Sequence, residues 1–371
     1  MKEALFLAAG IVLFLLGMMK LSGEVQKLFN ARIRSFIRYV VAKPVYGLLT
    51  GIMSTILFQS SSATTLLTIG MVSAGLISFY HSLGVILGAD IGTTLTVQLV
   101  VWKITDLSPA FIICGGVLWL SGNTRWKPWG EAVFSFGLMF FGLSLTASAT
   151  APLKDSEVFL RFFKEVKNPF FGIGIGALFT GIVHASAIPI SILIILAQQD
   201  LITIESALPI VFGANIGTTV TALMASTVAD ISGKRSAVSH FLFKCCGTVI
   251  CLAISPILIT TLKSLSGNAA QQIAFAHFLF NALICIAFIF ILRPFARLIE
   301  KIMPGREETL PLWPEFLVEK NLGDPDAALS CVRKELQREI VLAQEMLRKS
   351  LGLIEDYREG ERRNLIYIVT A

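Results

Sequence analysis

The chain has 371 residues, of which 54% are hydrophobic and only 15% are charged. A soluble domain carries charges at about a quarter of its positions, so this composition excludes an ordinary soluble protein and predicts an all-α polytopic membrane protein. The net charge of +6 gives no reason to expect a nucleic-acid partner, because the basic residues cluster at the ends of long apolar stretches.

The first apolar stretch, Ala4 to Met19, lacks a small-residue cleavage site and is predicted to be a retained membrane span rather than a signal peptide. Residues 20–43 follow it and are rich in basic side chains. These are Lys20, Lys27, Arg32, Arg34, Arg38 and Lys43. Positive charge marks the cytoplasmic side of a membrane protein. Residues 1–43 are therefore predicted to form a first transmembrane helix and a basic cytoplasmic loop.

A polar run, QSSSATT from Gln59 to Thr65, interrupts the next apolar region. Seven residues turn almost twice around a helix, so their polar groups cannot all face one protein neighbour. Non-helical backbone at membrane depth is tolerated only around a cavity, and we therefore predict a re-entrant helical hairpin. Its hydroxyls, amide and helix N-terminal N–H groups would suit an oxyanion or sodium. The alternative, packing of small polar residues between helices, stays open for single residues such as Ser62.

A glycine-rich motif, GADIGTT from Gly88 to Thr94, is expected to open the following span. Thr93 and Thr94 supply oxygen atoms there. Asp90 is the notable member, because an ionisable group at membrane depth is costly and usually functional. We interpret its carboxylate as a cation ligand, with a helix cap near the membrane interface as the alternative.

The same motif recurs as GANIGTT, 125 residues later. A shift of 125 residues aligns 47–96 with 172–221 without a gap, and fifteen of the fifty pairs are identical. We predict three spans between the copies, at about 82–102, 109–120 and 130–148. An odd number of crossings inverts the second copy relative to the first. Inverted repeats are typical of secondary transporters, which bind their substrate between the copies near the membrane midplane.

The second copy of the polar run, HASAIPIS from His184 to Ser191, has fewer hydroxyls. His184 replaces Gln59, and only Ser186 keeps a serine of the first copy. Pro189 removes a backbone donor and is expected to break the hairpin helix. In the second glycine motif, Asn215, Thr218 and Thr219 are candidate ligands.

Two further segments, AVSHFLFK and AFAHFLFN, resemble each other. The first places His240 and Lys244 four residues apart, and the second places His277 and Asn281 in the same way. Residues four apart share one face of a helix. These four side chains either line the site or pack between helices.

At these motifs the chain resembles the sodium–phosphate cotransporter family, the bacterial relatives of the type II sodium–phosphate cotransporters. The opening LFLLGMMKLSGE adds to the resemblance, which covers residues 1 to about 300. It implies sodium-coupled import of inorganic phosphate by alternating access across the inner (plasma) membrane. Asp90 and Lys244 each stand where the family more usually has Asn. The candidate phosphate and sodium ligands are Gln59, Ser60, Ser61, Ser62, Thr64, Thr65, Asp90, Thr93, Thr94, His184, Ser186, Asn215, Thr218 and Thr219.

After Pro304 the chain becomes charged and helically periodic. Leu329, Val332, Leu336, Ile340, Ala343 and Leu347 form an apolar stripe. This pattern predicts a soluble cytoplasmic helix, similar to the start of a PhoU-like domain. A single helix cannot bury such a stripe alone, so a second copy of the chain or a cytoplasmic protein is the expected partner.

The resulting organisation has a first repeat at 44–148, an external linker at 149–169, a second repeat at 170–303 and a cytoplasmic part at 304–371. Besides phosphate transport, we consider transport of another oxyanion or a dicarboxylate, and a phosphate sensor acting through the C-terminal helix. A serine hydrolase using Ser61 and His184 lacks the GxSxG motif. We therefore predict no enzymatic activity and no cofactor. The expected partners are phosphate, sodium as the coupling ion, and the lipid bilayer.

Overall fold

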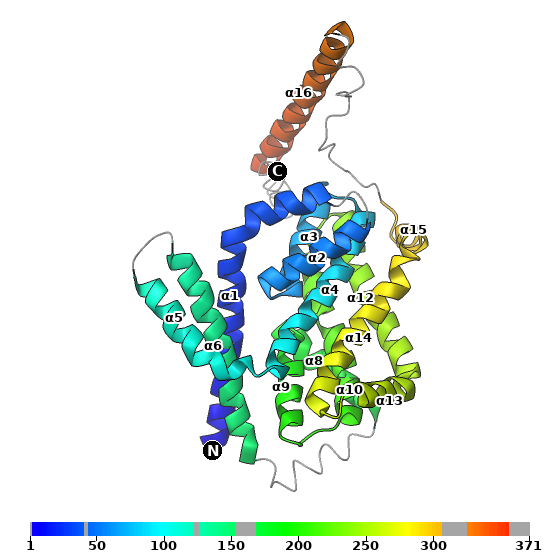
Figure 1. Cartoon of the computed structure of the whole chain (residues 1–371). Coiled ribbons are helices and arrows are strands. Elements are labelled where there is room, and N and C mark those ends of the chain that lie inside the picture. Colours follow the sequence, from blue (N-terminus) through cyan, green and yellow to red (C-terminus); the bar gives the residue numbers. More distant parts are fainter. Residues whose placement is uncertain (1, 41–43, 122–125, 153–167, 306–324, 356–371) are drawn as a thin grey trace.

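The computed structural model describes residues 2–40, 44–121, 126–152, 168–305 and 325–355, and this part of the chain is almost entirely helical (Figure 1). The elements are α1 (Lys2–Val40), α2 (Pro44–Phe58), α3 (Ser61–Ser73), α4 (Phe79–Val101), η1 (Ile104–Leu107), α5 (Ser108–Leu120), α6 (Lys127–Thr150), α8 (Pro169–Val183), α9 (Ala187–Gln198), α10 (Ile204–Gly217), α11 (Thr219–Ser226), α12 (Ile231–Ala253), α13 (Ser255–Leu265), α14 (Ala269–Ile289), α15 (Leu292–Ile302) and α16 (Pro325–Glu355).

Within the described residues, six helical segments are long and apolar enough to cross a membrane. They are Leu5–Val25, Phe79–Val101, Lys127–Thr150, Ile204–Ser226, Ile231–Ala253 and Ala269–Ile289. Four shorter apolar helical segments accompany them, at Val45–Phe58, Ile104–Leu120, Pro169–Val183 and Ala187–Gln198. The predicted all-α polytopic membrane protein is therefore confirmed.

The first helix differs from the sequence-based prediction. Residues 20–40 were expected to form a loop, but α1 continues without interruption from Lys2 to Val40. Lys, Arg and Leu are good helix formers, and no glycine or proline interrupts residues 24–40. The basic segment is therefore a helical extension of the first span. Residues 41–43 lie outside the described part of the chain.

The element boundaries repeat with the 125-residue offset found in the sequence. Helix α2 shifted by 125 residues coincides with α8, and α4 coincides with α10 and α11 together. Residues with left-handed backbone also recur at the same offset. Gln59 and His184 both have left-handed backbone, with φ of 50° and 61°, and so do Gly75 and Asp200. This agreement supports a duplicated unit of three helices.

The glycines of the repeated motif lie in the middle of helices, not at the start of a span as expected. A Cβ at Gly88 would lie 2.0 Å from the carbonyl oxygen of Leu48, and a Cβ at Gly213 would lie 2.0 Å from that of Ile173. Only glycine permits this approach of α4 to α2 and of α10 to α8. Asp90 therefore lies inside α4 and does not cap it.

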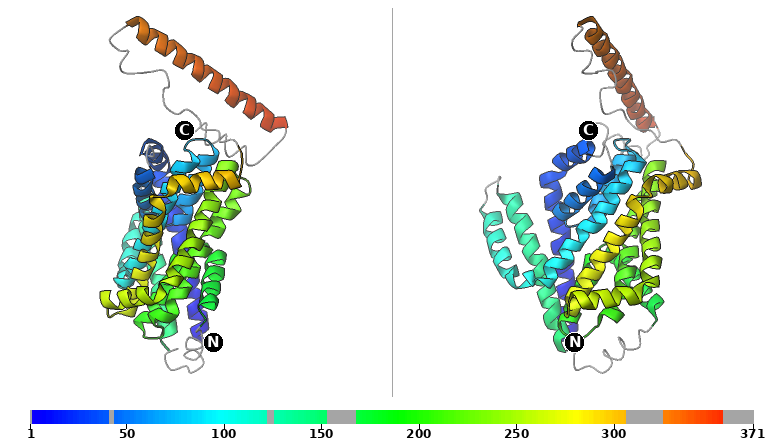
Figure 2. Two further views of the ribbon diagram at one scale, coloured as in Figure 1. Left: turned by 90° about the vertical axis from the view of Figure 1, so that its right-hand side faces the viewer. Right: turned by 45° about the vertical axis from the view of Figure 1, so that its right-hand side comes forward.

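The helices form two groups (Figures 1 and 2). Helices α1, α5 and α6 pack together on one side, and the duplicated units, α2 to α4 and α8 to α11, pack with α12 to α15 on the other. Helix α6 ends at the end of the molecule opposite to the C-terminal end of α1. Inversion of the second repeat relative to the first stays a prediction.

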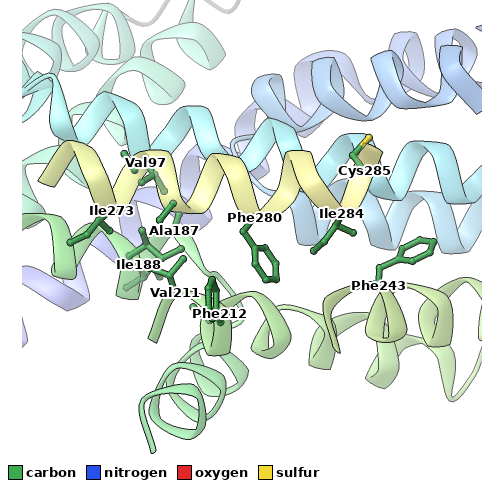
Figure 3. Close-up of a cluster of buried hydrophobic side chains, with 14 of the residues drawn as sticks. Val97, Ala187, Ile188, Val211, Phe212, Phe243, Ile273, Phe280, Ile284 and Cys285 are labelled. Atoms are coloured by element: carbon green, nitrogen blue, oxygen red, sulfur yellow. The ribbon is translucent and has the colours of Figure 1, made fainter. Parts of the chain in front are cut away.

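Helix α4 is the centre of the second group. Its residues Leu83, Val85 and Ala89 are fully buried, and it contacts α2, α3, α9, α12 and α14. Figure 3 shows part of the surrounding apolar core, where Phe212 of α10 faces Phe280 of α14. Their ring centroids are 5.5 Å apart. This packing fixes α10, α12 and α14 around the polar residues described below.

Helix α16 contains the apolar stripe predicted from the sequence. Leu329, Leu336 and Leu347 are exposed on it. The partner expected to cover this stripe and the likeness to a PhoU-like domain stay predictions.

Candidate functional site

The polar run of the first repeat coincides with a break between two helices. Helix α2 ends at Phe58, Gln59 has left-handed backbone, and Ser60 caps α3 by accepting a hydrogen bond from the Ala63 N–H at 3.2 Å. A left-handed non-glycine residue costs about 1–2 kcal/mol, so surrounding contacts must hold it. The predicted interruption of the helix is therefore present. The path of the two helices relative to a membrane stays a prediction.

Side chains around this break bond to one another. The Gln59 side chain donates to the Ile56 carbonyl at 2.7 Å and accepts from the Thr96 hydroxyl at 2.8 Å. Thr55 donates to the Thr64 hydroxyl at 2.9 Å. These bonds fix Gln59 and leave the hydroxyls of Ser61 and Ser62 at the start of α3, both partly exposed.

The second repeat breaks at the equivalent place. Helix α8 ends at Val183, His184 has left-handed backbone, and α9 begins at Ala187. Pro189 was expected to break the helix, but it lies in the first turn of α9, where backbone N–H groups have no helical partner to lose. The interruption therefore precedes the proline.

The two breaks meet each other in space. The Ser62 hydroxyl of the first repeat donates to the His184 carbonyl of the second at 3.0 Å. The His184 ring, through Nδ1, lies 3.2 Å from the Thr221 hydroxyl. This contact repeats that of Gln59 with Thr96, 125 residues earlier. The serine-hydrolase alternative gains no support, because the ring contacts a threonine and only the backbone of His184 meets the serine run.

The threonines of the glycine motifs are all buried. Thr94, Thr218 and Thr219 each donate to the backbone carbonyl three residues earlier in the chain, at 2.6 to 2.7 Å. Thr65 and Thr93 differ, because their buried hydroxyls have no hydrogen-bond partner among the described residues. Buried polar groups are nearly always satisfied, so these two hydroxyls are candidates for contact with a bound ion or water.

A second group of site residues surrounds Lys244 of α12. The Lys244 ammonium lies 2.8 Å from Asp90 Oδ2, 2.6 Å from Asn281 Oδ1 and 3.3 Å from Asn215 Oδ1. His240 Nε2 lies 3.1 Å from Asp90 Oδ1. We call these five residues the Lys244 cluster. Each is at most 5% exposed, and they come from α4, α10, α12 and α14.

His277 lies beside this cluster but does not join it. Its carbonyl accepts from the Asn281 side chain at 2.9 Å, whereas its buried ring nitrogens have no partner among the described residues. Of the four residues predicted either to line the site or to pack between helices, His240 and Lys244 contact Asp90, and Asn281 contacts Lys244. The prediction that Asp90 ligates a mobile cation stays untested, and its two oxygens here contact a lysine and a histidine.

Three residues that the sequence analysis did not single out belong to the site. Thr55, Thr96 and Thr221 bond to its members. A signal was present, because Thr55 and Thr180 form one identical pair of the 125-residue alignment and Thr96 and Thr221 form another. Threonine is common in membrane helices, so identity in both repeats is the only mark that separates these residues from others.

Comparison with known proteins gives consistent results. The model of the Na+/Pi-cotransporter family matches residues 13–148 and 155–291. An uncharacterized protein of Bacillus subtilis, YqeW, is 29% identical over 297 residues, which are 80% of this chain and 97% of that protein. A putative inorganic phosphate export protein of Escherichia coli, YjbB, is 28% identical over 98% of this chain and 68% of its own length. The human sodium-dependent phosphate transport protein 2B is 30% identical over 118 residues, which are 29% of this chain and 17% of that protein. No solved structure matches.

Proposed function

We propose that this chain, which belongs to the Na+/Pi-cotransporter family, is a sodium-coupled secondary transporter that imports inorganic phosphate. Phosphate and sodium bind where the two helix breaks meet, and alternating access carries them across the membrane. The family is one of transporters, and six helices have the length and apolar composition of membrane spans.

The observation that carries this proposal is the contact between the breaks, where Ser62 donates to the His184 carbonyl at 3.0 Å. The first turn of α3 begins here, and the N–H groups of a first helical turn favour an anion. The hydroxyls of Ser60, Ser61 and Ser62 line the same turn. Phosphate, with several acceptor oxygens, suits this set of donors.

Sodium is assigned to the oxygen atoms behind this turn. Sodium, like other hard cations, prefers hydroxyl, amide and carbonyl oxygens. The hydroxyls of Thr65 and Thr93 are buried and have no partner among the described residues. Thr65 follows Thr64 in the chain, and Thr93 follows Gly92, whose Cβ position lies 2.8 Å from Thr55 Cβ. A cation there would satisfy hydroxyls that otherwise cost free energy by being buried alone.

The two repeats supply a route for alternating access. In many secondary transporters, repeats of opposite orientation exchange their conformations around one central site. Here the repeats share their element boundaries and meet at their breaks. We propose that they are inverted and that rocking of one against the other opens the site to each side in turn.

Net export of phosphate is a second candidate function. The alignment with YjbB covers 98% of this chain, and that protein is named a putative inorganic phosphate export protein. A symporter moves phosphate inward when the sodium gradient points inward. Export therefore requires either exchange with another ion or flux down the phosphate gradient. The two candidates differ in their response to sodium.

Radiolabelled phosphate flux into proteoliposomes tests the proposal. Vesicles with the purified chain are diluted into sodium or choline chloride of equal ionic strength. We expect uptake in sodium and little in choline, and no competition by sulfate or succinate. Ser61→Ala should raise the phosphate concentration for half-maximal uptake, whereas Thr260→Ala should not, because that hydroxyl is exposed on α13 and bonds its own helix.

Equal flux in sodium and choline would refute sodium coupling and favour the export candidate. Efflux from phosphate-loaded vesicles, measured in the same two salts, would then establish passive release or exchange. If succinate, added at the same concentration as phosphate, inhibits phosphate uptake, the chain is instead a transporter of dicarboxylates.

A further inference from the structure

The environment of the Lys244 ammonium has the chemistry of a binding site for a monovalent cation. Three side-chain oxygens lie around it, from Asp90, Asn281 and Asn215, at 2.8, 2.6 and 3.3 Å. One of the three is a carboxylate oxygen and two are amide oxygens. Carboxylate and amide oxygens also bind hard metal cations, so the same cage would accept a sodium ion.

The rest of the pocket isolates this charge from water. Lys244 is 1% exposed, and its ammonium lies 5.7 Å from the ring centroid of Phe280. Phe280 and Phe212 belong to the apolar cluster shown in Figure 3. Transfer of an ammonium from water to an apolar interior costs free energy, and the three side-chain oxygens around Lys244 offset this cost. The cluster pairs one carboxylate with one ammonium, which makes it a poor site for an anion.

The chain itself contains neutral counterparts of both charged residues. Asp90 corresponds to Asn215 in the second repeat, and Lys244 corresponds to Asn281 in the second of the two similar HFLF segments. The other three side chains, Asp90, Asn215 and Asn281, all contact the Lys244 ammonium. The acid and the lysine thus form a matched pair: the carboxylate supplies the charge that a bound cation needs, and the lysine supplies that cation.

We propose that the Lys244 ammonium is a built-in cation that permanently fills a sodium-type site formed by Asp90, Asn215 and Asn281. Removal of the lysine opens this site to a free sodium ion. The binding claim stands on the cluster alone. Its consequence, a transport cycle with one fewer coupled sodium ion, rests on the proposed function.

The test is sodium binding by the purified full-length chain in detergent, with no transport measured. Lys244→Asn removes the ammonium and keeps the Asp90 carboxylate. It also gives the first HFLF segment the same residue that the second has in Asn281. The matched control is the double substitution D90N/K244N, which has the same shape but lacks the carboxylate. Radiolabelled sodium binding and the midpoint of thermal unfolding are measured for both variants and the wild type, in sodium or in choline chloride.

We expect Lys244→Asn to bind one more sodium ion per chain than the wild type, and to be stabilised by sodium far more than by potassium or choline. The double variant should bind this additional ion about tenfold or more weakly, because a charged ligand is lost. Failure of Lys244→Asn to fold in choline with recovery in sodium also supports the proposal, since sodium then replaces the lost partner of Asp90.

Three results would overturn it. One is unchanged sodium stoichiometry in Lys244→Asn, and another is equal sodium binding by the single and double variants. The third is a single variant that cannot be recovered even in high sodium while the double variant folds. None of these measurements uses phosphate flux. The inference can therefore fail while sodium-coupled transport by the wild type holds, and it can hold while sodium-coupled transport fails.

Discussion

The two helix breaks share one backbone but differ in their side chains. Each begins with a left-handed residue whose side chain contacts a threonine on the following span, Thr96 in the first repeat and Thr221 in the second. The first repeat adds the Thr55–Thr64 bond and a serine cap. In the second, Pro189 replaces Thr64, and the Thr180 hydroxyl is buried without a partner among the described residues.

This difference separates what the architecture needs from what the ligands need. Close helix packing and the left-handed turn occur in both repeats, so they belong to the duplicated scaffold. The hydroxyl set at the start of α3 is not matched at the start of α9. Only the first repeat donates a side-chain hydrogen bond in the contact between the breaks, from Ser62. Ala187 is the equivalent residue of the second repeat and has no hydroxyl to donate. The first repeat is therefore expected to supply most of the ligands.

The comparison of the two helix breaks depends on inversion of the repeats. The prediction with the largest expected effect, on the side from which single cysteines are labelled, tests this inversion. Single cysteines at Arg34 and Lys234 should be labelled by a membrane-impermeant thiol reagent only from the cytoplasmic side. A cysteine at position 164, outside the described residues, should be labelled only from the other side. The background chain needs its own six cysteines removed, all of which have free thiols in the structure. Labelling of positions 34 and 164 from the same side would end the inverted interpretation.

Helix packing should respond equally in the two repeats. Gly88→Ala and Gly213→Ala each place a Cβ about 2.0 Å from a backbone oxygen of the neighbouring helix. We expect each to lower the free energy of unfolding by about 3 kcal/mol or more, as severe overpacking does. Gly174→Ala is the control, because nothing lies within 4 Å of its Cβ position. Thermal unfolding in detergent measures all three. A much milder effect at one glycine would show that its repeat packs less closely.

Sequence reasoning succeeded where a pattern was both local and repeated. The all-helical fold and the interruption at QSSSATT followed from composition and the polar run, whereas the second interruption was expected at Pro189 and lies at His184. The basic stretch in 20–40 was predicted as a loop, because charge distribution reports membrane side and not secondary structure. The Lys244 cluster could not be assembled from sequence, since its members come from four helices and only their crossing brings the charges together.

Substitution of the serines that directly precede α3 and α9 should affect the two repeats unequally. Ser60 accepts a hydrogen bond from the Ala63 N–H, whereas Ser186 makes no such side-chain bond at the start of α9. Ser60→Ala should therefore cost about 1 kcal/mol of stability, and Ser186→Ala much less. In transport, Ser60→Ala should raise the apparent phosphate or sodium constant about three- to tenfold. Equal effects of the two substitutions on the transport constants would mean that both repeats supply ligands.

The smallest effect concerns the threonine pair behind the breaks, and here the sign differs between the repeats. Thr55→Val removes a donor to Thr64 and should cost about 1 kcal/mol. Thr180→Val removes a buried hydroxyl without a partner among the described residues, so it should be neutral or stabilise by up to about 1 kcal/mol. Unfolding midpoints in sodium and in choline measure both. If Thr180→Val destabilises the chain only in sodium, then the second break holds a sodium ion at Thr180, and the repeats are more alike in function than their side chains indicate.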